Sequence, residues 1–202
     1  INMTIIKCEY GEYDSRFQKT FKLFKYNIKN SIDIGSSFAL YQNGNNLINL
    51  YGGSKSKKNK EEWHEDTIVN VYSVSKGLLA ISNSILLDRG LIDLDKAISH
   101  YCSKFNKPVH DKITLRLLFS HQGGLYSWKE KVIASDLYDW EKCVSLLAKQ
   151  DLFYKPGEET SYHVTTIGYL IGEIFISVTG NTIGNFVKKE LIRDKTCKCF
   201  IG

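Results

Sequence analysis

The sequence lacks the features that mark membrane-spanning, secreted or repetitive proteins. No apolar run approaches the roughly 20 residues that a membrane-spanning helix needs, so no membrane span is expected. No charged segment followed by an apolar core opens the chain, so no secretory signal is visible. Because the chain begins with Ile1 rather than Met, this observation says little about targeting. Internal repeats and low-complexity linkers are also missing.

Cysteines are few and irregularly spaced. The five are Cys8, Cys102, Cys143, Cys197 and Cys199. An odd count at irregular spacing does not indicate a disulfide framework. The Cys197-x-Cys199 pair is too tight for the usual zinc spacing, and no His-x-x-x-His partner accompanies it. We therefore expect no metal site and mostly reduced thiols, which favours a cytoplasmic location.

The sequence also has no large excess of charge of one sign. With 27 basic and 22 acidic residues the net charge is only +5, and the one basic run, residues 55–60, has the composition of a solvated loop. One basic loop is not a basic face, so nucleic-acid binding is not expected. The 202 residues are 43% apolar and 24% charged, which is typical of a globular protein with one large domain or two small ones.

The stretch Val71–Gly77 carries a serine and a lysine at the start of an apolar run. Ser73 and Lys76 are three residues apart, so on a helix they share one face. The apolar run predicts a buried helix that ends near Asp88, with Gly90 as its C-cap. A serine hydroxyl is a weak nucleophile that needs a base, and a lysine whose pKa is lowered by desolvation can be that base.

A simpler interpretation of this stretch is open. Ser-x-x-Lys is a short pattern that also occurs by chance. In this alternative, Ser73 or Ser75 only caps the helix and Lys76 lies in solvent. Further elements of a site are needed to choose between the two.

The first part of the chain predicts a helix followed by two antiparallel strands. Apolar residues at helical spacing span residues 15–32. Asn43-Gly44 then separates the apolar runs 37–41 and 47–53, which is a strong hairpin signal. We therefore place an N-terminal helix and hairpin unit over residues 1–65.

The sequence pattern over residues 66–202 predicts a helical unit that contains Ser73 and Lys76. Thr114 is placed to cap a short helix, and Pro156-Gly157 makes a turn. Tyr162 follows in a loop before a buried helix, where a tyrosine hydroxyl can take part in proton transfer. An ordinary half-buried tyrosine would fit the same position. Longer helices are predicted over residues 139–150, 167–178 and 182–192.

Together these segments resemble the serine hydrolases related to class C β-lactamases, penicillin-binding proteins and β-lactamase-like esterases. The stretches that carry the resemblance are DTIVNVYSVSKG at 66–77, GLIDLD at 90–95, ITLRLL at 113–118, SHQGGL at 120–125, KPG at 155–157 and YHVTTIGY at 162–169. The resemblance implies an α/β fold of the α+β type, β-lactamase/transpeptidase-like, in which an antiparallel sheet carries a helical domain.

The resemblance also implies a role for each site residue. Ser73 would be the acylated nucleophile, Lys76 its proton acceptor or orienting partner, and Tyr162 an aid in proton transfer to the leaving group. Whether Lys76 or Tyr162 is the base stays open. The backbone N–H of Ser73 would form half of an oxyanion hole. No metal or organic cofactor is implied, and the expected partner is a small-molecule ester or amide.

One departure from the family pattern shapes the expected activity. The residue two after the tyrosine, Asn in the β-lactamases, is Val164 here. This removes a side chain that could hydrogen-bond a β-lactam or peptide amide, which favours an esterase. His163 and His121 are candidates for binding substrate, with a structural role as the alternative. A β-lactamase or a D-Ala-D-Ala peptidase is an alternative activity, and a non-catalytic acyl-sensing or scaffold protein is an alternative of another class.

A second departure concerns the length of the chain. Nothing in the sequence fits the third family motif, of the Lys-Thr-Gly or His-x-Gly type, and the strands that should flank the Asn43-Gly44 hairpin are not visible. We therefore expect the front part of a longer enzyme, truncated before the C-terminal strands. Such a part would be inactive and poorly stable, because the hairpin would keep an open edge and an uncovered apolar face. The oligomeric state is not indicated.

Overall fold

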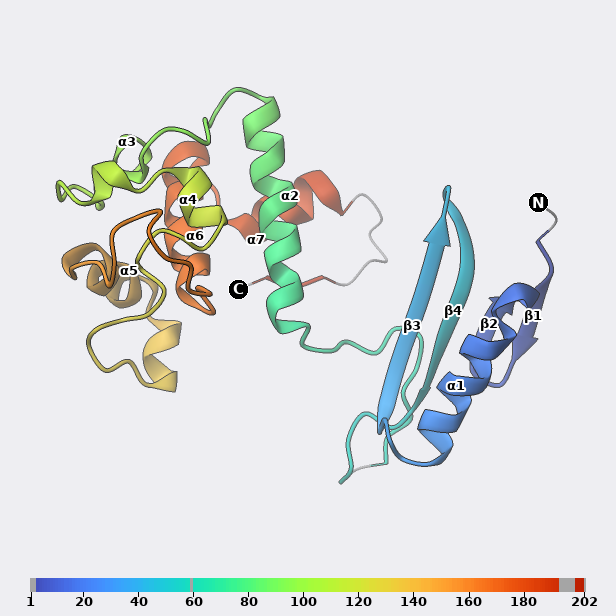
Figure 1. The fold of residues 1–202 in the computed structure, drawn as a ribbon. Coiled ribbons are helices and arrows are strands. Elements are labelled where there is room, and N and C mark those ends of the chain that lie inside the picture. Colours follow the sequence, from blue (N-terminus) through green and yellow to red (C-terminus); the bar gives the residue numbers. More distant parts are fainter. Residues whose placement is uncertain (1–2, 59, 193–198, 202) are drawn as a thin grey trace. The chain divides into compact units, whose positions relative to one another are not determined.

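The computed structural model describes residues 3–58, 60–192 and 199–201 (Figure 1). The chain divides into two compact units, residues 1–70 and 71–202. Each unit has a hydrophobic core of its own.

The first unit is a four-stranded antiparallel sheet with one helix. The strand order in the sheet is β1-β2-β4-β3. The chain order of the elements is β1 (Ile5–Cys8), β2 (Gly11–Asp14), α1 (Gln18–Lys29), β3 (Gly35–Gln42) and β4 (Asn45–Gly53). Helix α1 confirms the helix predicted within residues 15–32, with a 3₁₀ turn at Ser15–Phe17 before it.

The predicted hairpin joins β3 to β4. Asn43 and Gly44 have φ angles of 51° and 77°, and a two-residue turn of type I′ needs positive φ at both central positions. The two strands pair antiparallel, with Phe38 opposite Leu50. The hairpin prediction is therefore confirmed.

The prediction of an uncovered hairpin is wrong for β4 and for the apolar face, whereas β3 lies at an edge of the four-stranded sheet, as predicted. Strand β4 is paired on its other side by β2, so it has no open edge. Helix α1 packs against the sheet, where Phe24 joins Tyr13, Leu47, Ile48 and Leu50 in a buried cluster. The sequence did not reveal β1 and β2 because each has only four residues, too few for an alternating pattern to stand out.

The second unit is helical. A 3₁₀ turn at Tyr72–Val74 leads into α2 (Ser75–Asp88), which is followed by α3 (Ile98–Tyr101), α4 (Leu115–Phe119), α5 (Trp140–Lys149), α6 (Thr166–Thr179), α7 (Ile183–Phe186) and a π-helical turn (Val187–Leu191). The predicted cap is confirmed, because Thr114 Oγ1 accepts a hydrogen bond of 3.2 Å from the backbone N–H of Leu117. Gly180 ends α6 in the left-handed conformation, with φ of 70°. Helix α3 was not predicted.

Helix α6 forms the centre of this unit's core. Leu170, Ile171 and Phe175 on α6 are almost fully buried and pack with residues of α2, α4 and α5. Within the described ranges, no single helix is long and apolar enough to cross a membrane. Among the described residues, one bent pair has the length and composition for a span: α6 taken together with Ile183–Leu191, at a bend of 64°.

Helix α2 is buried on one face only. Leu79 and Leu86 belong to the core, together with Ser82 and Asn83 on the same face. Ile81, on another face, is 49% exposed. The prediction of a helix buried over most of its surface is therefore wrong for half of the helix.

The cysteines within the described ranges, Cys8, Cys102, Cys143 and Cys199, are free thiols. Cys102 and Cys143 are buried in the core of the helical unit. Cys197, the other member of the Cys197-x-Cys199 pair, lies outside the described residues.

Candidate active site

Ser73 and Lys76 face each other at the start of α2. Ser73 lies in the 3₁₀ turn that leads into the helix, and Lys76 lies in its first turn. The side-chain nitrogen of Lys76 is 3.2 Å from Ser73 Oγ. The three-residue spacing therefore brings the hydroxyl and the amine into hydrogen-bond contact.

The neighbouring serine has a different partner. Ser75 Oγ donates a hydrogen bond to the backbone carbonyl of Tyr72. Tyr72 has a φ of 45°, a left-handed conformation that non-glycine residues seldom adopt. Ser75 therefore holds a strained turn in front of α2, while the hydroxyl of Ser73 is directed at Lys76.

A loop distant in the sequence completes the surroundings of Lys76. Lys76 Nζ donates to the backbone carbonyl of Val164 over 2.7 Å. It also lies 5.0 Å from the ring centroid of Tyr162, a distance at which a cation is attracted to an aromatic face. The loop between α5 and α6 therefore meets the start of α2 at this point.

Tyr162 belongs to the same cluster. Its side chain is 48% exposed, so its hydroxyl is accessible from solvent. A hydrogen bond with Ser73, and then one with Lys76, hold the pKa of the Tyr162 phenol below its usual value. The structure therefore brings together all three residues for which the sequence predicted a catalytic role.

The two predicted histidines lie beside Tyr162 in different environments. His163 is fully buried, and its Nδ1 lies 2.7 Å from the carbonyl oxygen of Ser161. Burial lowers the pKa of His163 to about 4. His121 is half-buried, with its ring centroid 4.7 Å from that of Tyr162. Burial, and then the charge of Lys76, lower the pKa of His121. Both imidazoles are therefore neutral near pH 7.

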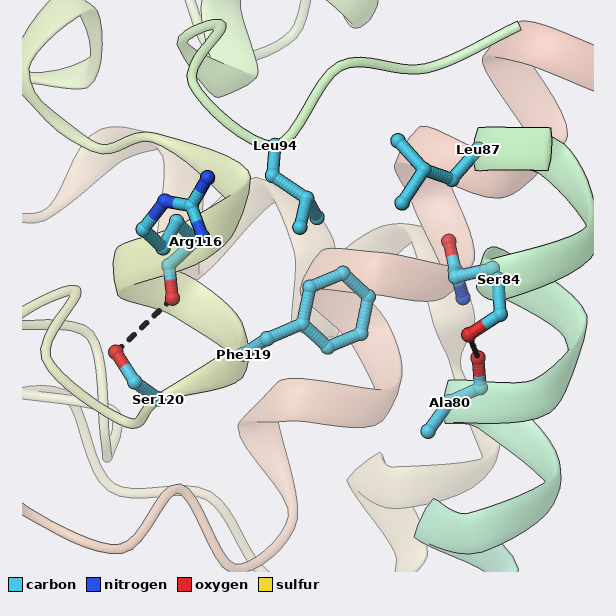
Figure 2. Close-up of a pocket in the computed structure, with 8 residues that line it drawn as sticks. Ala80, Ser84, Leu87, Leu94, Arg116, Phe119 and Ser120 are labelled. Carbon is cyan, nitrogen blue, oxygen red and sulfur yellow. Dashed lines mark hydrogen bonds between the residues drawn. The ribbon is translucent and has the colours of Figure 1, made fainter. Parts of the chain in front are cut away.

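A pocket that was not predicted lies between α2 and α4 and has a volume of about 400 Å³ (Figure 2). It is lined by Ala80, Asn83, Ser84, Leu87, Leu94, Arg116, Phe119 and Ser120. The guanidinium of Arg116 makes two hydrogen bonds to Asp95, of 2.7 and 2.9 Å. None of the predicted site residues lines this pocket. The sequence gives little indication of this pocket, because the lining residues from α2 differ from the rest of the helix only by their helical spacing.

Comparison with known proteins connects the chain to a family. The family model described as beta-lactamase matches residues 24–196. The chain belongs to the beta-lactamase family. The match extends over both units, and it confirms the resemblance on which the site residues were chosen.

Curated relatives of this family carry esterase and β-lactamase names. The esterase/beta-lactamase LipL of Mycobacterium tuberculosis is 27% identical over 185 residues, which cover 90% of this chain and 42% of LipL. The mitochondrial serine beta-lactamase-like protein LACTB of Mus musculus is 26% identical over 84 residues, 40% of this chain and 15% of that protein. The chain therefore spans less than half the length of these relatives.

Solved structures confirm the predicted fold. A family VIII carboxylesterase is similar with a TM-score of 0.84 and 31% identity, over 96% of this chain and 51% of that one. A penicillin-binding protein homologue from Caulobacter crescentus has a TM-score of 0.83 and 26% identity, over 95% and 50% of the two chains. The antiparallel sheet and the helices thus form about half of a β-lactamase/transpeptidase-like fold.

Proposed function

We propose that this protein is a serine hydrolase that cleaves small esters through an acyl-serine intermediate on Ser73. The observation that carries the proposal is the contact between Ser73 Oγ and Lys76 Nζ at 3.2 Å, beside the ring of Tyr162, whose phenol has its pKa lowered by Ser73 and then by Lys76. A nucleophile that touches two groups able to accept its proton has the arrangement that covalent catalysis requires.

The first half of the reaction forms the acyl-enzyme. Ser73 Oγ attacks the ester carbonyl carbon and gives its proton to Lys76 or Tyr162. The carbonyl oxygen becomes an oxyanion, which the backbone N–H of Ser73 would stabilise, as the resemblance to the family implies. When the tetrahedral intermediate collapses, the bond to the alcohol breaks, and the alcohol oxygen takes the proton that Ser73 released.

The second half of the reaction releases the acid. A water molecule attacks the acyl carbon and gives a proton to the same base. When this second tetrahedral intermediate collapses, the bond to Ser73 Oγ breaks and Ser73 takes that proton from the base. The hydrogen bond from Lys76 to the carbonyl of Val164 holds the amine beside Ser73 Oγ, which supports a role for Lys76 in proton transfer. The lowered pKa of Tyr162 supports the phenolate as the alternative base.

Position 164 favours esters over β-lactams. The Val164 side chain is 60% exposed and offers no hydrogen bond to a substrate amide. An ester has a better leaving group and needs fewer hydrogen bonds to hold it. The esterase names of LipL and of the family VIII carboxylesterase agree with this choice. β-Lactamase or D-Ala-D-Ala peptidase activity is the alternative within the same mechanism.

The test is a comparison of kcat/KM for p-nitrophenyl acetate and nitrocefin, with the protein at its full natural length. We expect the ester to be hydrolysed faster, and Ser73→Ala to abolish its turnover. Ser75→Ala is the comparison: it removes a hydroxyl that supports the turn but does not contact Lys76, so measurable turnover remains. A faster reaction with nitrocefin would assign the protein to the β-lactamases. A single stoichiometric burst without turnover would identify an acyl-sensing protein instead.

A further inference from the structure

The loop that carries Tyr162 is hydrogen-bonded to one residue at the end of α4, His121. The backbone N–H of Ser161, just before Tyr162, donates to the carbonyl oxygen of His121 over 3.1 Å. The backbone N–H of His163, just after Tyr162, donates to His121 Nδ1, also over 3.1 Å. A third bond of 3.1 Å comes from the hydroxyl of Tyr154 to the same carbonyl. Both neighbours of Tyr162 are therefore bound by a single residue.

His121 is itself held firmly. Its backbone N–H donates to the carbonyl of Leu118 over 3.1 Å, and that of Gln122 donates to Leu117 over 2.7 Å, so both close the end of α4. The φ of His121 is 62°, the left-handed conformation that commonly ends a helix. The imidazole of His121 contacts the loop, where its ring meets that of Tyr162 edge-on at 63°.

We propose that His121 is a positioning residue that holds the Tyr162 hydroxyl at Ser73 and Lys76, and that it does so only while its imidazole is neutral. The proposal rests on the hydrolase function proposed above, since it names the residue that orients one member of that site.

The dependence on charge follows from the direction of one hydrogen bond. His121 Nδ1 accepts from the His163 N–H, so the proton of the neutral ring is on Nε2. A second proton would place an N–H on Nδ1 opposite the N–H of His163, and this bond would be lost. The titratable groups around the ring are Lys76 from α2 and Tyr154, Tyr162 and His163 from the loop.

A positive charge on the His121 imidazole would also be electrostatically unfavourable. Lys76 already lowers the pKa of His121, after the larger effect of burial. Protonation in acid would therefore set two cations against each other and detach one side of the Tyr162 loop. We expect Tyr162-dependent proton transfer to weaken as the pH falls.

Three variants separate positioning from folding. His121→Gly fits the positive φ without strain but has no acceptor for the His163 N–H. His121→Asn also tolerates positive φ, and its side-chain oxygen can replace Nδ1 as acceptor without titrating. The control is His110→Asn, because the Nδ1 of His110, which is fully buried, also accepts a backbone N–H, that of Lys107, over 3.2 Å. The ring of His110 packs on Phe105, not on Tyr162.

The first readout is ester hydrolysis. We expect His121→Gly to lower kcat by roughly ten- to a hundredfold with little change in KM, because Tyr162 assists proton transfer and does not bind substrate. His121→Asn should restore most of kcat and keep more of it in acid than the wild type does. The proposal would be overturned if His121→Gly had the kcat of the wild type. It would also be overturned if kcat of His121→Asn fell at low pH in the same way as that of the wild type.

The second readout does not depend on activity. The Tyr162 phenol is titrated by NMR of protein labelled at the tyrosine ζ carbons, with its signal assigned by Tyr162→Phe. We expect its pKa to move up toward the ordinary tyrosine value in His121→Gly and to stay lowered in His121→Asn and His110→Asn. An unchanged titration in His121→Gly would contradict the proposal. If this shift occurs but Ser73→Ala has no effect on hydrolysis, the positioning stands and the proposed function fails.

Discussion

Lys76 Nζ and the carbonyl oxygen of Val164 lie 2.7 Å apart, although 88 residues separate them in the chain. This bond joins the start of α2 to the loop before α6. The acceptor that positions the lysine amine in that loop is a backbone carbonyl, not a side chain. The same nitrogen is 3.2 Å from Ser73 Oγ. The lysine therefore has one hydrogen-bond partner in each of the two segments that form the site.

The two serines near Lys76 should differ in reactivity. A fluorophosphonate should label Ser73 and leave Ser75 unmodified, because Ser73 Oγ contacts Lys76 while Ser75 Oγ is engaged with the Tyr72 carbonyl. Peptide mass mapping of the labelled protein locates the adduct. An adduct on Ser75, or on Ser161 beside the tyrosine, would mean that the nucleophile has been misassigned.

Replacing the lysine by arginine should separate charge from proton transfer. Lys76→Arg keeps the positive charge but cannot give up its proton at working pH, so we expect ester turnover to fall by roughly a hundredfold or more. Lys155→Arg is the control, because Lys155 is exposed and paired with Glu158 at 3.0 Å. Circular dichroism checks that both variants fold. Turnover of Lys76→Arg within about tenfold of the wild type would show that the lysine acts only through its charge.

The packing of α6 against α5 can be tested with two glycines of one helix. A Cβ at Gly172 would lie 2.6 Å from the ring of Trp140, which cannot move freely because its Nε1 donates to Glu173 over 2.7 Å. Gly172→Ala should therefore lower the free energy of unfolding by about 1–3 kcal/mol.

Gly168 is the matched control for this pair. A Cβ there meets nothing within 4 Å. Gly168→Ala should raise the free energy of unfolding by about 0.5–1 kcal/mol, because alanine is the better helix former. Both values come from urea unfolding. Equal effects of the two substitutions would contradict the close contact with Trp140.

Buried His163 should make stability depend on pH. Its pKa is lowered from 6.5 to about 4 by burial, so between these values the unfolded chain binds a proton that the folded chain does not. Its contribution to stability is complete above pH 6.5 and is lost as the pH falls through about 4. The expected slope is about 1.4 kcal/mol per pH unit, with His110 and His121 adding in the same direction.

Urea unfolding between pH 4 and pH 7 measures this slope. His163→Asn should reduce it, since the asparagine amide can still donate to the Ser161 carbonyl but does not titrate. His100→Asn, at an exposed position, should leave it unchanged. A slope that is the same in all three proteins would show that His163 does not resist protonation.

Features governed by neighbouring residues could be predicted from the sequence. The Asn43-Gly44 turn, the Thr114 cap and the end of α6 at Gly180 depend on backbone conformations and short hydrogen bonds within a few residues. The pairing of Ser73 with Lys76 is of the same kind, because three residues on a helical turn fix it. The family could also be inferred, since its motifs lie in continuous stretches.

Features that depend on distant residues could not be predicted. Strand β2 pairs with β4, which is distant in the sequence, and β1 pairs with β2. A strand of four residues is too short for an alternating pattern to predict it. The sequence showed a histidine at 121, but only the tertiary structure decided that it binds the backbone on both sides of Tyr162. The physical reason is that these atoms belong to segments about 40 residues apart, which meet only because α4 and the loop before α6 pack around one core.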